Sequence, residues 1–187
     1  LNNFQSITPT VEQTLLEYLN YYRELGVTTL LDAGNFGLDR EMYAAVSRLD
    51  KKGLLPVRYH GAYTLFIPSD LPDAVETLKQ LGNDFNSANV QIDTLKIFFD
   101  GVLETRTAAI SKDYLDTPNN RGEALLSRAQ VHELILDLEE EDFNLHVHAV
   151  GDRATTTILD AIQDAHESLK RAPTITITIC HLEVVKD

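Results

Sequence analysis

Apolar residues recur along the 187-residue chain in two patterns. In some stretches they return every three or four positions, as in a helix with one buried face, and in others they form the short runs typical of buried strands. The helical stretches are 10–25, 39–52, 71–81, 127–138 and 153–170. The strand-like runs are Val27–Leu31, Leu55–Leu65, Thr94–Phe99, Leu145–His148 and Ile175–His181. Strands and helices therefore alternate along the chain.

Several helix ends carry local signals. Thr10–Gln13 and Ser127–Gln130 have the spacing of a capping box, in which the first side chain and the residue three positions later bond each other's backbone N–H groups. Asp152 follows Gly151 at the start of a helix, where we expect it to be the N-cap. The acidic run 139–142 is expected to be a solvated helix end.

The alternation is typical of a parallel sheet with right-handed helical crossovers. An open doubly wound sheet and a (β/α)₈ barrel both fit this order. No G-x-G-x-x-G follows any strand, which counts against a dinucleotide-binding sheet. A complete barrel takes about 250 residues, so five strands would form only part of one. Because candidate polar residues lie at strand ends, we predict an α/β fold in which residues 1–187 are a single domain, a partial (β/α)₈ barrel.

Lys96 is the first candidate for a catalytic or metal-binding role. In its strand, Leu95, Ile97 and Phe99 share one face, so Lys96 points to the other, which would be the barrel interior. A buried lysine is costly unless its charge is paired or removed. An ion pair with Asp100 or an inward glutamate is the commoner explanation. The functional alternatives are a Schiff-base lysine and a carbamylated lysine that binds metal.

Three histidines lie on the two following strands. His146 and His148 share one face of a strand, about 7 Å apart along it. His181 ends the last strand and by alternation shares its face with the isoleucines 175, 177 and 179. Two histidines on one face and a third on the next strand favour a metal site over isolated core histidines. Cys180 faces the other way by alternation and is expected to be a small buried apolar residue.

Other polar residues carry weaker signals. His60 lies on the second strand between two tyrosines and is a candidate for lining a pocket. The irregular segment Gly101–Leu126 is too long for an ordinary connection, so it is expected to be functional or lid-like. Arg106, within this segment, either holds a substrate carboxylate or pairs with Glu104 or another acid.

Composition limits the partners. The formal net charge is −13, which counts against nucleic acids and anionic membranes because both require a basic surface. With a single cysteine the chain cannot form an internal disulfide, so cysteine usage does not identify the compartment. A cytoplasmic location is slightly favoured. The expected partners are a small-molecule substrate and further copies of the same chain.

Three stretches resemble the amidohydrolase superfamily, and within it the YtcJ-like or amidohydrolase-3 family. They are LKIFFDGVLETRTA at Leu95–Ala108, HVHAVGDRA at His146–Ala154 and ICHLE at Ile179–Glu183. Gly26–Thr29 and the spacer from Tyr114 to Leu126 also look like this family. The resemblance implies a (β/α)₈ barrel with one or two divalent metals, usually zinc. It also implies hydrolysis of C–N bonds in amides, formamides or related compounds.

The resemblance assigns residue roles. Lys96 matches the fourth-strand lysine that bridges two metals when carbamylated, and His148 and His181 match the fifth- and sixth-strand ligands. The residues expected to support these ligands or contact the substrate are His146, Asp100, Arg106 and His60. The metals would lower the pKa of a bound water and polarise the scissile carbonyl.

Two elements of the family pattern have no counterpart in this sequence: the first-strand His-x-His pair and the eighth-strand aspartate, which would be the general acid/base. The strands here match the second to sixth of the barrel. We therefore expect an internal fragment that is inactive alone and that self-associates through its open edge.

Two other interpretations compete with a hydrolase. One is a non-catalytic regulatory or binding protein on a hydrolase-like barrel, because fold alone does not determine function. The other is a complete open α/β domain with a structural histidine cluster, which would be a stable monomer without metal.

Overall fold

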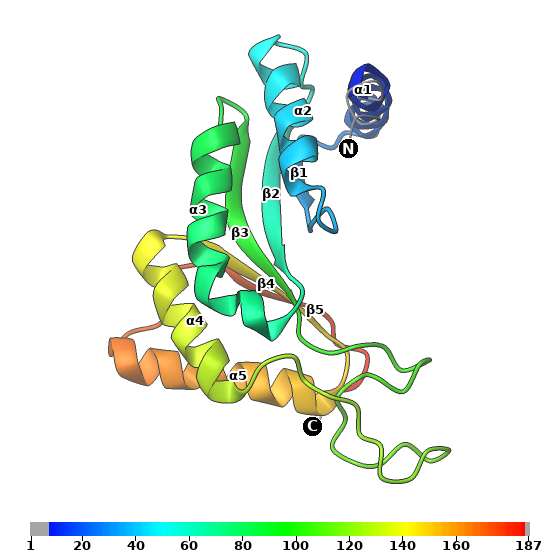
Figure 1. Ribbon diagram of the computed structural model, residues 1–187, viewed down its shortest axis with the longest axis vertical. Helices are drawn as coiled ribbons and strands as arrows, with labels where there is room; N and C mark the ends of the chain where they lie inside the picture. Colours follow the sequence, from blue (N-terminus) through cyan, green and yellow to red (C-terminus); the bar gives the residue numbers. More distant parts are fainter. Residues whose placement is uncertain (1–7, 186–187) are drawn as a thin grey trace. The chain divides into compact units, whose positions relative to one another are not determined.

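A computed structural model describes residues 8–185, with strands and helices alternating along the chain (Figure 1). The five strands are ordered β1-β2-β3-β4-β5 in one sheet, the order in which they occur in the sequence. β1 pairs with β2 in parallel, as β4 does with β5. This order of successive strand–helix units confirms the expected α/β fold, part of a (β/α)₈ barrel.

The chain forms two compact units. The first comprises the chain up to Thr64 together with Glu76–Thr94, and the second comprises Leu65–Val75 and the chain from Leu95. The elements of the first unit are α1 (Thr8–Glu24), β1 (Thr29–Asp32), α2 (Asp39–Lys51), β2 (Arg58–Leu65) and α3 (Ala74–Phe85). Those of the second are η1 (Pro68–Asp73), α4 (Arg128–Glu141), β4 (Asn144–Ala149), α5 (Asp152–Leu169) and β5 (Ile177–His181). Strand β3 (Val90–Phe98) belongs to the first unit up to Thr94 and to the second from Leu95.

A tyrosine pair organises the core of the first unit. Tyr43 is completely buried, and its hydroxyl donates to the carbonyl oxygen of Ala62 at 2.6 Å. Its ring packs edge-on against Tyr59, whose hydroxyl donates to Asp32 at the end of β1. Burial raises the pKa of both phenols, so both remain protonated donors.

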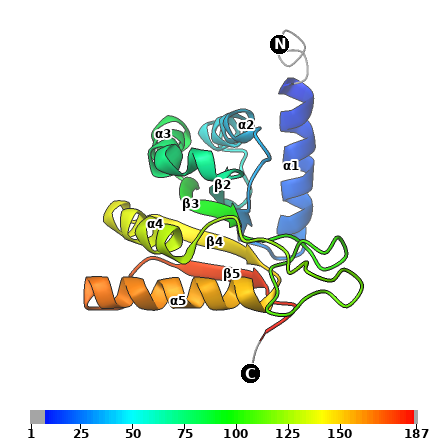
Figure 2. The same ribbon diagram turned by 60° about the horizontal axis from the view of Figure 1, so that its bottom comes forward.

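The core of the second unit lies between its strands and its helices. The aliphatic face predicted for β3 is completely buried, as are the core positions of α4 and α5. Figure 2 shows α4 and α5 side by side along β4 and β5, and the loops after β3 gather at the arrowhead ends of these strands. Because active sites of such folds form at strand C-termini, this end of the second unit is where chemistry is expected.

The structure corrects several expected boundaries. β3 begins at Val90, four residues earlier than predicted, because Val90 and Ile92 alternate with more exposed neighbours and are buried. The helix expected over 71–81 is a 3₁₀ turn containing Pro72 followed by α3. The capping box at Ser127 is confirmed. The one at Thr10 is wrong, because α1 already begins at Thr8.

Asp152 is not the N-cap of α5 as expected. Gly151 occupies that position, and a Cβ built on it would lie 2.0 Å from the carbonyl oxygen of Ala109. Only glycine therefore allows the loop after β3 to approach so closely. None of the helices described between residues 8 and 185 has the length and apolar character needed to span a bilayer.

Candidate metal centre

Lys96 lies near the end of β3 with its side chain in the interior of the second unit, only 3% exposed. Its Nζ donates to Sγ of Cys180 at 3.6 Å and stands 5.0 Å from the centre of the Phe98 ring. No carboxylate in the described part of the chain pairs with it, so the expected ion pair with Asp100 is absent. Burial lowers the pKa of the Lys96 ammonium, and Cys180 offsets part of that effect.

His148 lies on β4, the strand next to β3, and is 7% exposed. Its Nε2 is 3.0 Å from the carbonyl oxygen of Gly101, and its ring packs against Phe98 with centroids 5.4 Å apart. Because a carbonyl oxygen can only accept, this contact places the proton on Nε2. In the neutral imidazole, Nδ1 then carries the free lone pair, as a metal ligand requires.

His181 reaches His148 through an unusual backbone conformation. Its φ is +81° and that of Leu182 is +53°, so the regular strand ends there. The His181 ring lies 4.5 Å from the His148 ring, centre to centre, in an edge-on arrangement. His181 is exposed, whereas His148 is buried. The two histidines assigned as ligands are therefore brought together.

The orientation predicted for Cys180 is wrong. In the register of β4 and β5, Cys180 pairs with His148, and its sulfur contacts Lys96 on the side where the ligands lie. It follows that Ile177 and Ile179 point to the opposite face rather than below His181. The alternation rule fails because His181 has a positive φ, which turns its side chain back towards the ligands.

His146 lies on β4 two residues before His148. Its Nδ1 is buried and has no hydrogen-bond partner within the described residues. Burial, assisted by the charges of Lys96 and His181, lowers the pKa of His146 to about 4. The imidazole is therefore neutral at pH 7 and offers an unsatisfied nitrogen beside the two ligand candidates.

Asp100 organises the backbone around these residues. Its side chain is completely buried, and its oxygens accept from the backbone N–H groups of Ala109, Val150 and Gly151, each at 2.9 Å. Oδ1 is 3.8 Å from Nε2 of His148. The carboxylate therefore joins the loop after β3 to the turn after β4, and it supports the position of His148.

The other two candidates are engaged elsewhere. Arg106 forms a two-pronged ion pair with Asp116, and its guanidinium also donates to backbone carbonyls of its own loop. It thus pairs with an acid, one of the two predicted alternatives, although the partner is not the Glu104 carboxylate. His60 belongs to the first unit, where its Nδ1 is 3.0 Å from Oδ2 of Asp93 on β3.

The donor set fits a divalent metal in type but is incomplete. Nowhere between residues 8 and 185 do three His, Cys, Asp or Glu side chains converge as metal ligands would. His148 and His181 offer two imidazoles. The buried Lys96 is the candidate for a third ligand. A cationic amine would repel a metal, whereas its carbamate would add the carboxylate oxygens that zinc accepts.

The comparisons with known proteins decide the family. The sequence profile of the amidohydrolase family matches residues 5–187. This chain belongs to the amidohydrolase family. Among solved structures it is similar to two crystal structures described as uncharacterized metal-dependent hydrolases. One is from Pyrococcus horikoshii OT3, with TM-score 0.69 and 22% identity over 96% of this chain and 34% of that one. The other, from Pyrococcus furiosus, has TM-score 0.71 and 23% identity, covering 96% and 35%.

Curated relatives have diverse names. The chain is 31% identical over 175 residues to "Exoenzymes regulatory protein AepA" of Pectobacterium carotovorum subsp. carotovorum, covering 93% of the chain and 36% of that protein. It is 32% identical over 111 residues to "Putative amidohydrolase YtcJ" of Bacillus subtilis (strain 168), covering 59% and 20%. The expected YtcJ-like relationship is confirmed. The chain spans only about a fifth to a third of the length of these relatives.

Sequence reasoning missed two contacts at this end of the unit. The Cys180–Lys96 contact follows from the register that pairs Cys180 with His148, and alternation from His181 predicted the opposite face because it assumed a regular strand up to that residue. Asp152 accepts from the backbone N–H of Ser111 at 2.8 Å and from its hydroxyl. This contact joins residues 41 positions apart, and only the folded loop reveals it.

Proposed function

We propose that this chain is the central part of a metal-dependent hydrolase that cleaves C–N bonds of small amide-type, non-peptide substrates. The observation that supports this most directly is the gathering of Lys96, His148 and His181 at the C-terminal ends of three successive strands. A buried lysine with no carboxylate partner among the described residues is costly unless its charge is removed. A lysine of this kind near two histidines is therefore a candidate for a functional role.

Lys96 would contribute as a carbamate. The neutral amine attacks the carbon of CO₂, a proton is released, and the product is an anionic N-carboxylate. Burial already lowers the pKa of Lys96 and so favours the neutral, nucleophilic amine. The thiol of Cys180 donates to the carbonyl oxygen of Val147, and its sulfur lies 3.6 Å from Nζ of Lys96.

The histidines and the Lys96 carbamate would together hold one or two divalent metals, with zinc the first choice. A bound metal supplies an activated water and polarises the carbonyl of the substrate. The carbonyl oxygen of Gly101 keeps the proton of His148 on Nε2, so Nδ1 would be the nitrogen that binds a metal. The neutral His146 would orient ligands or water from below. The general acid/base is expected outside this chain.

A second function is favoured by one comparison. The name of the relative from Pectobacterium describes a regulatory protein, so we also propose, as an alternative, a barrel that binds a ligand and regulates without catalysis. The proposed hydrolysis requires a bound metal, whereas regulation by ligand binding does not. In either case we propose that copies of the chain associate and that the partner is a small molecule, not nucleic acid.

Activity of the full-length protein tests the proposal. With zinc supplied, we expect hydrolysis of simple amides or formamides, and we expect His148→Ala to lower kcat by at least about a hundredfold because it removes a metal ligand. His166→Ala is the matched control, since His166 is an exposed residue on α5. Equal activity in wild type and His148→Ala would refute the catalytic role.

A further inference from the structure

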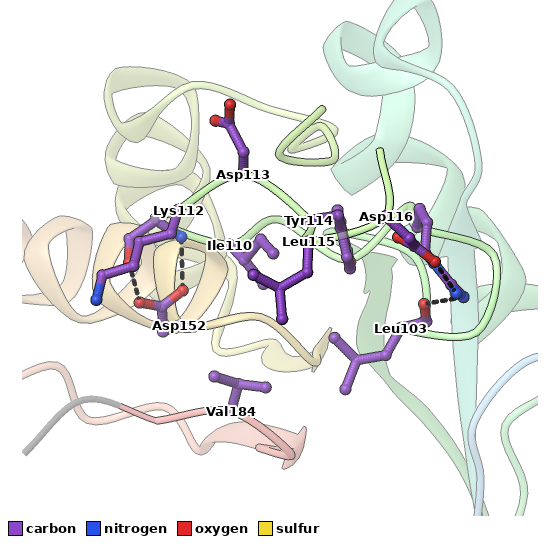
Figure 3. Close-up of a pocket in the computed structure, with 11 residues that line it drawn as sticks. Leu103, Ile110, Lys112, Asp113, Tyr114, Leu115, Asp116, Asp152 and Val184 are labelled. Atoms are coloured by element: carbon purple, nitrogen blue, oxygen red, sulfur yellow. Dashed lines mark hydrogen bonds and ion pairs between the residues drawn. The ribbon is translucent and has the colours of Figure 1, made fainter. Parts of the chain in front are cut away.

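A cavity of about 780 Å³ opens among the segments that follow β3, β4 and β5. Figure 3 shows that its walls come from the loop after β3, from Asp152 at the start of α5 and from Val184 after β5. These segments follow the strands that carry Lys96, His148 and His181, so the cavity lies at the same end of the second unit. Its volume falls within the roughly 300–1,000 Å³ range of small-molecule sites.

Apolar side chains face the interior of this cavity. Ile110, Leu115, Leu103 and Val184 are turned towards the same space in Figure 3, whereas the carboxylate of Asp113 points away from it. Leu115 is completely exposed to solvent. A fully solvated leucine that faces a cavity loses its contact with water when an apolar ligand covers it, which favours binding.

The acidic groups of the wall are already paired. Asp116 binds Arg106, Asp113 binds Arg121, and Asp152 accepts twice from Ser111. The wall therefore offers few uncommitted charges to a ligand. An uncharged group can enter without breaking an ion pair, whereas an anionic group would meet three carboxylates against two cations, Arg106 and Lys112.

The loop that builds the wall is held in place before any ligand binds. Tyr114 and Thr117 form an isolated antiparallel bridge, and the Tyr114 hydroxyl donates to the carbonyl oxygen of Ala108 at 2.9 Å. The Arg153 guanidinium on α5 donates to carbonyl oxygens of the loop, including that of Gly122 at 2.7 Å. A preformed wall reduces the ordering cost of binding.

We infer that this cavity binds the uncharged, apolar group of the substrate, an aliphatic chain or aromatic ring, and that Leu115 determines specificity for it. The inference rests on the proposed amide hydrolysis for the identity of the reacting bond. It adds the substrate class: amides whose non-reacting part is apolar and without charge.

Matched amides test the inference in the full-length protein with zinc supplied. Hexanamide carries an apolar chain, acetamide lacks it, and adipamate has the same chain ending in a carboxylate. We expect kcat/KM for hexanamide to exceed that for acetamide at least about tenfold. Leu115→Ala should lower this ratio about tenfold. Leu159→Ala, at an exposed leucine of α5 away from the cavity, should keep the wild-type ratio.

Binding measured without turnover distinguishes failure of this inference from failure of the proposed hydrolase function. The affinities of hexanamide and adipamate are measured by ligand-observed NMR titration of wild type and Leu115→Ala. Weaker hexanamide binding in the variant supports the inference even if no amide is cleaved, an outcome in which the hydrolase proposal alone fails. Equal hexanamide affinity in both proteins, or tighter binding of adipamate to wild type, overturns the inference.

Discussion

At the residue scale, the candidate site depends on side chains that position other side chains. The inward direction of the Lys96 and His148 side chains was predictable from the sequence, because each lies on a strand whose opposite face is aliphatic. His181 was predicted as a ligand, but its conformation was not, because a positive φ at a histidine has no sequence signature. Asp100 was predicted only as a candidate, and its three backbone partners depend on loops that strand periodicity does not describe.

Asp100→Asn tests the role of this carboxylate. The amide replaces one acceptor oxygen with an NH₂ group that faces backbone N–H donors in a buried site. We expect a loss of about 3 kcal/mol in the free energy of unfolding, because buried donors lose a charged acceptor. Chemical denaturation measures this change. Asp73→Asn, at an exposed aspartate of η1, is the control, and an Asp100→Asn protein as stable as that control would contradict the role.

At the element scale, one carboxylate joins the end of α4 to the residues that lead into β5. The acidic run 139–142 is not uniformly solvated as the sequence suggested, since the Glu139 side chain is only 4% exposed. It accepts from Arg171 and from both the backbone and the hydroxyl of Thr174. Burial acts to raise its pKa, but these hydrogen bonds outweigh burial and lower it to about 2.

The lowered pKa makes stability depend on pH. Between about 4.5, the ordinary pKa of glutamate, and about 2, the unfolded chain binds the proton more readily than the folded one. The stability from Glu139 is therefore present above this window and is lost as pH falls through it. In Glu139→Gln we expect a loss of about 1–3 kcal/mol at pH 7 and a shallower decline below pH 4.5.

Urea denaturation at a series of pH values checks this prediction. Glu140→Gln is the matched control, because Glu140 is the exposed neighbour of Glu139 on α4. If both variants lose stability in parallel with wild type as the pH falls, the Glu139 contacts do not stabilise the folded chain.

At the scale of the whole molecule, the order of strands and helices was predictable because hydrophobic periodicity alone distinguishes them. The parallel strand order and the family follow from it and from the three motifs. The cavity wall was not predictable, because segment 101–126 lacks periodicity and is held by ion pairs and backbone contacts between distant positions. A segment of this length was nevertheless a signal of function.

The central claim is that Lys96, His148 and His181 bind metal in the full-length protein. Metal content measured by mass spectrometry, on wild type beside Lys96→Ala, tests it most directly. The control variant is Lys51→Ala, which removes an exposed lysine at the end of α2, outside the ligand cluster. We predict about one or two zinc ions per wild-type chain, fewer in Lys96→Ala and an unchanged content in the control. Absence of metal from all three proteins, purified without chelator and supplied with zinc, would contradict the metal centre.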